Sequence, residues 1–239
     1  DCIDGMYAFA AYVPAEHTLH LVRDPFGVKP LFALHHDGAL WFASEVTALL
    51  MVPGFVPRPS PDALHHFLSL DYIPGSLTAF DGIVEIRPGA WWAIDVRTGA
   101  ITKRSHAETR WETDSSITVA EATAHSRALL EQAVARQLVA DVEVGVMLSG
   151  GLDSSTIAAL TAQIRGGGDF HTFSIGFEDD SFNEAHHARA VAQHLGTTHH
   201  TVVVRAEDVE RRLSGVIAAI GEPYADGSAL PTAMLAEVA

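Results

Sequence analysis

A strand-like run, a glycine turn and a helix-like run follow one another between Val144 and Leu160, and this order constrains the fold most strongly. The stretch reads VGVMLSGGLDSSTIAAL. Ordering a glycine costs more backbone entropy than ordering any other residue, so such a turn must serve a purpose. Strand-like and helix-like segments go on alternating after it, which predicts a parallel sheet with helices packed on its faces.

The alternation begins soon after residue 113. Thr118 followed by Glu121 is the pattern of a capping box, which predicts that a helix starts there. Apolar periodicity then predicts further elements in order: strand 142–148, helix 153–164, strand 170–177, helix 183–196, strand 200–204 and a helix through 209–220.

The first part of the chain is expected to be rich in β-structure. Short aromatic and β-branched runs predict strands at 6–13, 18–22, 31–36 and 40–44, and a second small β region at 83–105. One or two helical turns are expected at 45–51 and a short helix at 62–70, with a proline-rich loop between them. The boundary lies near residue 110 in a connector, 106–116, which gives the domains 1–110 and 111–239.

Composition excludes several classes of function. The net charge is −15, and an acidic surface repels a phosphate backbone, so no nucleic-acid partner is expected. No apolar run is long enough to span a membrane. The single cysteine, Cys2, cannot form an internal disulfide and suits a reducing cytoplasm. Several of the 14 histidines stand in adjacent pairs, whose members do not share a face, so no zinc site is expected and the metal is left unknown.

The turn between Ser149 and Ser155 is a candidate site for nucleotide phosphates. A helix N-terminus after the first strand of a parallel sheet offers free N–H groups and a partial positive charge. The Walker pattern is excluded, because the only lysines are Lys29 and Lys103, and the G-x-G-x-x-G pattern is absent. A tight turn that binds no ligand is the alternative.

Two sets of segments carry a resemblance. Residues 149–154, SGGLDS, resemble the pyrophosphate loop SGGxDS of the ATP pyrophosphatase superfamily, and 5–12, 21–32 and 40–50 resemble segments of class II glutamine amidotransferase domains. Residues 71–95, 173–200 and 221–236 are similar to stretches of asparagine synthetases. The combination resembles the glutamine-hydrolysing asparagine synthetase family, and both ends of the chain then look like cuts through a longer protein.

The resemblance implies an α/β fold in two parts. A partial, β-rich glutaminase domain of the N-terminal-nucleophile type would precede a parallel α/β domain of the adenine-nucleotide-hydrolase type. The implied enzyme is a cytoplasmic ligase that uses ATP with Mg²⁺, glutamine and aspartate, and forms asparagine through an acyl-adenylate while releasing AMP and pyrophosphate. A homodimer is compatible with it.

The resemblance also implies which residues bind ATP and the substrate. The pyrophosphate-loop positions are Ser149, Gly150, Gly151, Asp153 and Ser154. Leu148 and Ile175 match positions that contact the adenine nucleotide, with simple core packing as the alternative, and Asp226 and Ser228 lie near the substrate region.

No catalytic residue is assigned in this chain. Cys2 follows Asp1, so its nitrogen is an amide that cannot take up a proton, and the family's nucleophilic cysteine lies far upstream. Arg23 and Asp24 are expected to be structural, as a salt bridge or a turn cap.

Two alternatives stay open at this point. One is a related enzyme that acts on another carboxylate, as a β-lactam synthetase does or as an enzyme amidating a cell-surface sugar or peptide would. The other is a non-catalytic descendant, whose mark would be decay of the SGGLDSS loop, and that loop is intact.

Overall fold

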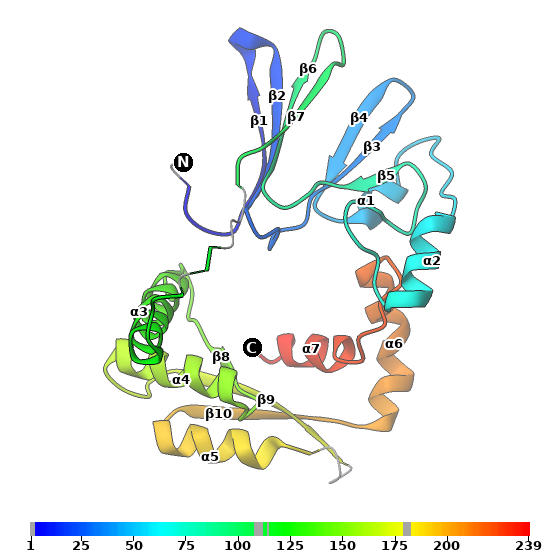
Figure 1. Cartoon of the computed structure of the whole chain (residues 1–239). Helices are drawn as coiled ribbons and strands as arrows, with labels where there is room; N and C mark the ends of the chain where they lie inside the picture. The colour runs from blue at the N-terminus through cyan, green and yellow to red at the C-terminus, as the bar shows by residue number, and fades with distance from the viewer. Residues whose placement is uncertain (1–2, 108–111, 114, 179–182) are drawn as a thin grey trace. The chain divides into compact units, whose positions relative to one another are not determined.

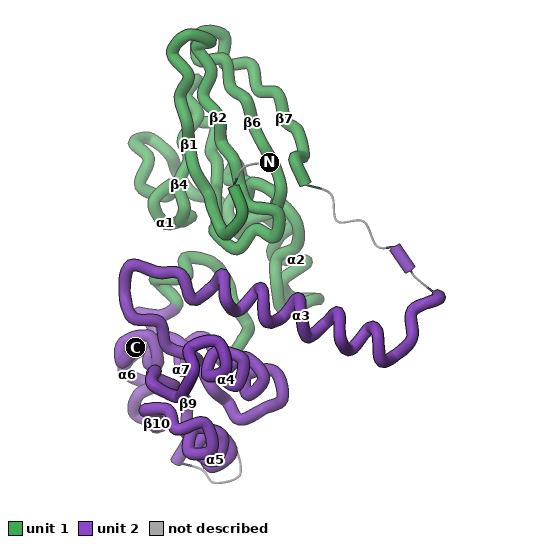
Figure 2. The backbone as a smooth tube through the Cα atoms, turned by 90° about the vertical axis from the view of Figure 1, so that its left-hand side faces the viewer, with its two compact units in different colours: residues 1–111, 217–226 green, residues 112–216, 227–239 purple. Residues whose placement is uncertain are grey.

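The computed structural model describes residues 3–107, 112–113, 115–178 and 183–239. The chain forms two compact units, shown in separate colours in Figure 2. Unit 1 contains residues 1–111 and 217–226, and unit 2 contains residues 112–216 and 227–239. Both helices and sheets are present, which confirms the predicted α/β class.

Unit 1 is built on two antiparallel sheets with the strand orders β1-β2-β6-β7 and β4-β3-β5 (Figure 1). The strands are β1 (Ala8–Val13), β2 (Thr18–Arg23), β3 (Phe32–His36), β4 (Ala39–Ala43), β5 (Ile83–Glu85), β6 (Ala90–Asp95) and β7 (Ile101–Ser105). A short 3₁₀ turn (Pro14–Glu16) joins β1 to β2, and α1 (Val46–Leu50) and α2 (Pro61–Leu70) follow β4. The predicted β-rich first part is therefore confirmed.

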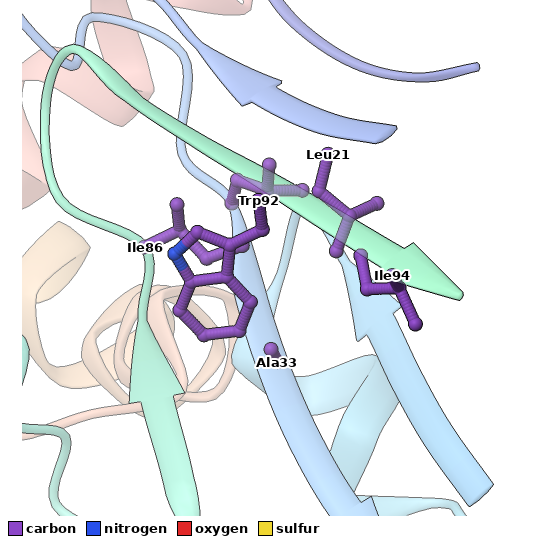
Figure 3. Packing of buried hydrophobic residues seen from close by; sticks show 6 residues of the cluster. Leu21, Ala33, Ile86, Trp92 and Ile94 are labelled. Atoms are coloured by element: carbon purple, nitrogen blue, oxygen red, sulfur yellow. The ribbon is translucent and has the colours of Figure 1, made fainter. Parts of the chain in front are cut away.

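The main core of unit 1 lies between its two sheets. Leu21 on β2 is paired with Trp92 on β6, and both side chains point to the same face, where they meet Ala33 of β3 and Ile86 (Figure 3). Alternate residues of a strand share a face, so the period-two pattern of β2 and β6 builds this core. Lys103 Nζ lies 4.1 Å from the centroid of the Trp92 ring and covers its outer side.

Unit 2 contains a parallel sheet with the order β10-β9-β8. Its strands are β8 (Val146–Met147), β9 (His171–Phe177) and β10 (Thr198–Val204); its helices are α3 (Val119–Gln137), α4 (Leu152–Arg165), α5 (Ala185–Leu195), most of α6 (Ala206–Ile220) and α7 (Ala229–Ala236). Figure 1 shows α5 and α7 on opposite faces of the two longer strands. The predicted alternation of strands and helices is confirmed.

The predicted strand 142–148 is wrong in its length, because only Val146 and Met147 form ladder pairs. β8 is an edge strand with β9 as its one neighbour, and Val142 is 78% exposed. Alternating valines indicate a strand only where a sheet buries one face of them, and nothing covers Val142 here.

The ends of the helices follow their sequence signals. The Thr118 side chain accepts the Glu121 N–H, and the Glu121 carboxylate accepts the Thr118 N–H, which confirms the predicted capping box of α3. α5 ends at Gly196 in the left-handed region, with φ of 74°. Part of the predicted connector, 108–111 and 114, lies outside the described residues. Across the ranges that are described, no helix is both long and apolar enough to cross a lipid bilayer.

Candidate functional site

The turn after β8 is closed by its own serines. Ser149 Oγ lies 2.9 Å from Ser154 Oγ, and the Ser154 hydroxyl also accepts the Ser149 N–H at 3.2 Å. The Gly151 N–H donates to Ser149 Oγ at 3.3 Å. The main chain is thereby held in one shape before any ligand arrives, with both hydroxyls at the N-terminal end of α4.

Two neighbouring glycines of the turn answer different needs. Gly150 has φ of 83°, and a Cβ there would lie 2.5 Å from the Ala188 nitrogen and 2.6 Å from the His187 carbonyl carbon. Gly150 is therefore required by the close approach of the turn to α5 and by its backbone conformation. A Cβ at Gly151 would meet only Ser149 Oγ at 3.4 Å, so this glycine leaves open space over the start of the helix.

A cavity of about 570 Å³ opens beside the turn. Of the predicted site residues, it is lined by Leu148, Ser149, Ser154, Ile175 and Ser228. The structure thus brings together the end of β8, the turn, the middle of β9 and the start of α7.

The remaining predicted positions lie outside the lining. Gly150, Gly151 and Asp226 do not line the cavity, and neither does Asp153, which is exposed on the first turn of α4. Leu148 is 1% exposed and packs with Val146 and Ala158 in the core between β8 and the helices, so core packing describes most of its environment.

Sequence reasoning missed several residues of the cavity wall. They come from β8, β9, the start of α5, and the first turns of α7: Met147, Phe173, Ser174, Phe177, Glu184, Gly227, Pro231, Thr232 and Leu235. Phe173 and Phe177 could have been found, because they stand two residues either side of Ile175 and therefore share its face of β9. Nothing in the sequence signals that α7 folds across this face.

The donor atoms of the cavity are oxygens. Hydroxyls of serine and threonine line it, together with the Glu184 carboxylate, and among its described lining residues there is no lysine or arginine. A phosphate ligand would meet no cationic side chain on these walls. Hydroxyl and carboxylate oxygens are the ligands that Mg²⁺ prefers, so this donor set fits a magnesium-bound nucleotide. In the described part of the chain, no group of three or more His, Cys, Asp or Glu side chains could hold a metal ion without such a ligand.

A buried polar network lies on the opposite face of β9 from the cavity. His199 on β10 is hydrogen-bonded through its two ring nitrogens to the hydroxyls of Thr172, at 2.9 Å, and Ser174, at 3.1 Å. Burial lowers the pKa of His199, and the positive charges of Arg189 and His200 lower it further. This network fixes β9 against β10 and holds the imidazole neutral, so it supports the cavity floor and takes no part in its chemistry.

Arg23 and Asp24 form the structural arrangement that was predicted, although they do not pair with each other. Arg23 makes an ion pair with Glu85 at 2.7 Å and donates to the carbonyls of Lys29 and Gly27. Asp24 is 1% exposed and caps the turn by accepting three backbone N–H groups, those of Phe26, Val28 and Lys29. Cys2 lies outside the described residues.

Comparisons with known proteins agree with this division of the chain. Residues 1–107 match the family described as glutamine amidotransferase domain, and residues 125–239 match the family described as asparagine synthase. A structure titled glutamine phosphoribosylpyrophosphate amidotransferase from B. subtilis aligns at 12% identity with a TM-score of 0.29, covering 96% of this chain and 59% of its own, which supports no argument.

Curated relatives carry one name. A putative glutamine-hydrolysing asparagine synthetase of Mycobacterium tuberculosis H37Rv is 35% identical over 98% of this chain and 36% of its own length. Asparagine synthetase 3 of Bacillus subtilis is 33% identical over 91% of the chain and 38% of its own length, and the asparagine synthetase of Gallus gallus is 29% identical over 90% and 38%. The chain thus spans little more than a third of the length of these relatives.

Two family matches in consecutive order, and relatives that align with nearly the whole chain, lead to one assignment. The chain belongs to the glutamine-hydrolysing asparagine synthetase family, with a glutamine amidotransferase part at residues 1–107 followed by an asparagine synthase part at residues 125–239.

Proposed function

We propose that the whole protein that carries this chain is an ATP-dependent, glutamine-hydrolysing ligase that converts aspartate to asparagine. The observation that carries the proposal is the position of Ser149 and Ser154 on the wall of a cavity whose floor is Ile175 and Phe173. A phosphate cradle at a helix N-terminus beside an apolar pocket is the arrangement that a nucleotide requires.

The reaction that this cradle suits is adenylation of a carboxylate. A carboxylate is a poor acyl donor, because its leaving group would be oxide. If a carboxylate oxygen attacks the α-phosphorus of ATP, the bond to the bridging oxygen breaks, pyrophosphate leaves, and an acyl-adenylate forms. Ammonia then attacks the acyl carbon, AMP leaves, and the amide is formed.

The residues of the turn would stabilise the departing pyrophosphate. Negative charge grows on it as the bond breaks, and preorganised N–H and hydroxyl donors lower the energy of that charge without rearranging. Oxygens of Asp153 and Glu184 are the carboxylates available to hold Mg²⁺, which when bound would neutralise phosphate charge that no side chain of the cavity wall neutralises.

Unit 1 has a separate role in this proposal. The predicted domain 1–110 belongs to the part that releases ammonia from glutamine, and the predicted domain 111–239 to the part that consumes it. The single cysteine fits a reducing compartment, so we place the protein in the cytoplasm, where a homodimer is compatible with its family.

Substitutions in the turn test the proposal. Ser149→Ala and Asp153→Ala in the whole protein are expected to abolish asparagine synthesis and to leave glutamine hydrolysis intact, because the two reactions occur in separate domains. Losing one preorganised donor at a developing charge costs roughly 3–4 kcal/mol, or several hundredfold in rate. The measurements are both rates and the melting temperature of each variant.

Thr156→Val is the matched control, because the Thr156 hydroxyl donates to the Leu152 carbonyl within α4 and does not line the cavity. It should retain both activities. If Ser149→Ala and Asp153→Ala lower only the melting temperature, by about the 1 kcal/mol that a helix cap contributes, and turn over normally, the turn binds no phosphate and the proposal is wrong.

A further inference from the structure

Residues 217–226 belong to unit 1, although the residues on both sides of them belong to unit 2 (Figure 2). The chain enters unit 1 within α6 and leaves it just before Gly227. Gly227 and Ser228 line the cavity described above. The segment therefore reaches the cavity wall directly through the covalent chain.

Gly221 makes the first of two contacts that hold this segment. It lies in the left-handed region, with φ of 77°, and a Cβ there would lie 2.5 Å from Thr47 Cγ2 and 3.0 Å from Val46 Cγ1. Val46 is the first residue of α1 and is 2% exposed. Only a glycine allows the end of α6 to approach α1 this closely.

Glu222 makes the second contact. Its carboxylate accepts the backbone N–H of Ala79 at 2.6 Å. Burial raises the pKa of Glu222, the Ala79 N–H lowers it, and the negative charge of Glu85 raises it again, with a net rise. Placing a carboxylate here is unfavourable apart from its hydrogen bond, so the bond must repay that cost.

The acceptor site for Glu222 is rigid. Ala79 is 5% exposed, and its carbonyl accepts the Ser60 N–H at 2.8 Å. The neighbouring Thr78 is 1% exposed, and its hydroxyl lies 3.0 Å from the Phe80 carbonyl and 2.9 Å from the Ile83 carbonyl. The Ala79 N–H is thus fixed in direction, and it can hold the Glu222 carboxylate in one place.

We propose that Glu222 is a positioning residue, whose hydrogen bond to Ala79 fixes residues 221–226 on unit 1 and thereby places Gly227 and Ser228 for nucleotide binding. This rests on the proposed function, because it takes the cavity as the ATP site. Five residues separate Glu222 from Gly227, so a shift of the anchor passes to the cavity wall with little slack. The bond links the amidotransferase part of the chain to the residues that would touch ATP.

The test compares three variants of the whole protein. Glu222→Ala removes the acceptor, Glu222→Gln keeps an oxygen that accepts the Ala79 N–H, and Glu210→Ala removes an exposed glutamate of α6 that has no recorded partner. Calorimetry with ATP and Mg²⁺ gives the Kd, and glutamine hydrolysis without ATP gives the kcat of the other reaction. We expect Glu222→Ala to raise the Kd at least tenfold, the other two to stay within threefold, and glutaminase kcat to change less than twofold in all three.

Hydrogen exchange on the wild-type protein gives an answer even if Glu222→Ala fails to fold. ATP with Mg²⁺ should slow exchange at 227–235 of the cavity and also at 217–226 and 76–83 in unit 1. Slower exchange at 227–235 alone, an unchanged Kd in Glu222→Ala, or a Kd in Glu222→Gln raised as much as in Glu222→Ala would overturn the inference and leave the proposed function standing. If the wild type binds no ATP, the proposed function fails and this inference fails with it.

Discussion

Gly150 and Gly151 look alike in the sequence and differ in the fold. The sequence reasoning gave both the same purpose, close approach of an anion to the main chain. The structure supports that purpose for Gly151, whereas Gly150 faces the backbone of α5. The reason could not be predicted from the sequence, because the contact joins segments 37 residues apart along the chain, residues 150 and 187.

Gly150→Ala should therefore destabilise the protein, whatever it does to ATP binding. The positive φ and the contacts of 2.5–2.6 Å with backbone atoms leave no room for a methyl group, and overpacking typically costs about 1–3 kcal/mol. Chemical unfolding of the whole protein measures this. Gly151→Ala is the control and should lose less than about 1 kcal/mol; equal losses in the two variants would contradict the assignment.

Asp24 is a second residue whose chemistry is fixed by its turn. Burial raises its pKa, but the N–H groups of Lys29, Val28 and Phe26 outweigh burial, and the pKa is lowered from 3.8. A lowered folded-state pKa means that the carboxylate stabilises the fold fully above the unfolded-state value, and that this contribution is lost as pH falls through the folded-state pKa.

Asp24→Asn is expected to lose about 2–4 kcal/mol at pH 7, because one amide cannot accept all three N–H bonds of a carboxylate. The difference from wild type should be constant from pH 7 to pH 5 and should shrink below 3.8. Urea unfolding across this range measures it, with the exposed Asp141→Asn as control. A difference that grows as pH falls would contradict the sign of the pKa shift.

Among the elements, α3 shows how local signals fix a helix start. Thr118 and Glu121 were sufficient to place it, because the capping box depends only on residues three apart. The apolar stripe of α5 was equally local: Ala188 and Ala192 are buried against β8 and α4. β8 failed the same reasoning, because the length of an edge strand depends on its neighbour and not on its own pattern.

Thr118→Ala tests the cap. It should cost about 1 kcal/mol of unfolding free energy, since two orphan N–H groups at the start of α3 lose their partner arrangement. Thr123→Ala removes a hydroxyl that donates to the Val119 carbonyl inside the same helix, and it should change stability by less than about 0.5 kcal/mol. Equal effects would show that the cap does not hold α3.

At the scale of the whole molecule, the order of the parts was predictable and the path of the chain was not. The change from antiparallel sheets to a parallel sheet follows from residue patterns on either side of residue 113. The return of residues 217–226 to unit 1 has no such signal, because Gly221 and Glu222 contact α1 and Ala79, which are more than 140 residues earlier. The cavity was half predicted for the same reason: the turn is local, and α7 arrives from a distance.

The central claim is that the SGGLDSS turn holds pyrophosphate as it leaves. The most direct measurement is the nucleotide product formed by the whole protein from ATP, aspartate and an ammonia source, separated by chromatography. The account predicts AMP and pyrophosphate in equal amounts with asparagine, because the carboxylate attacks the α-phosphorus. ADP and phosphate as the main products would contradict it, since they require cleavage at the γ-phosphate.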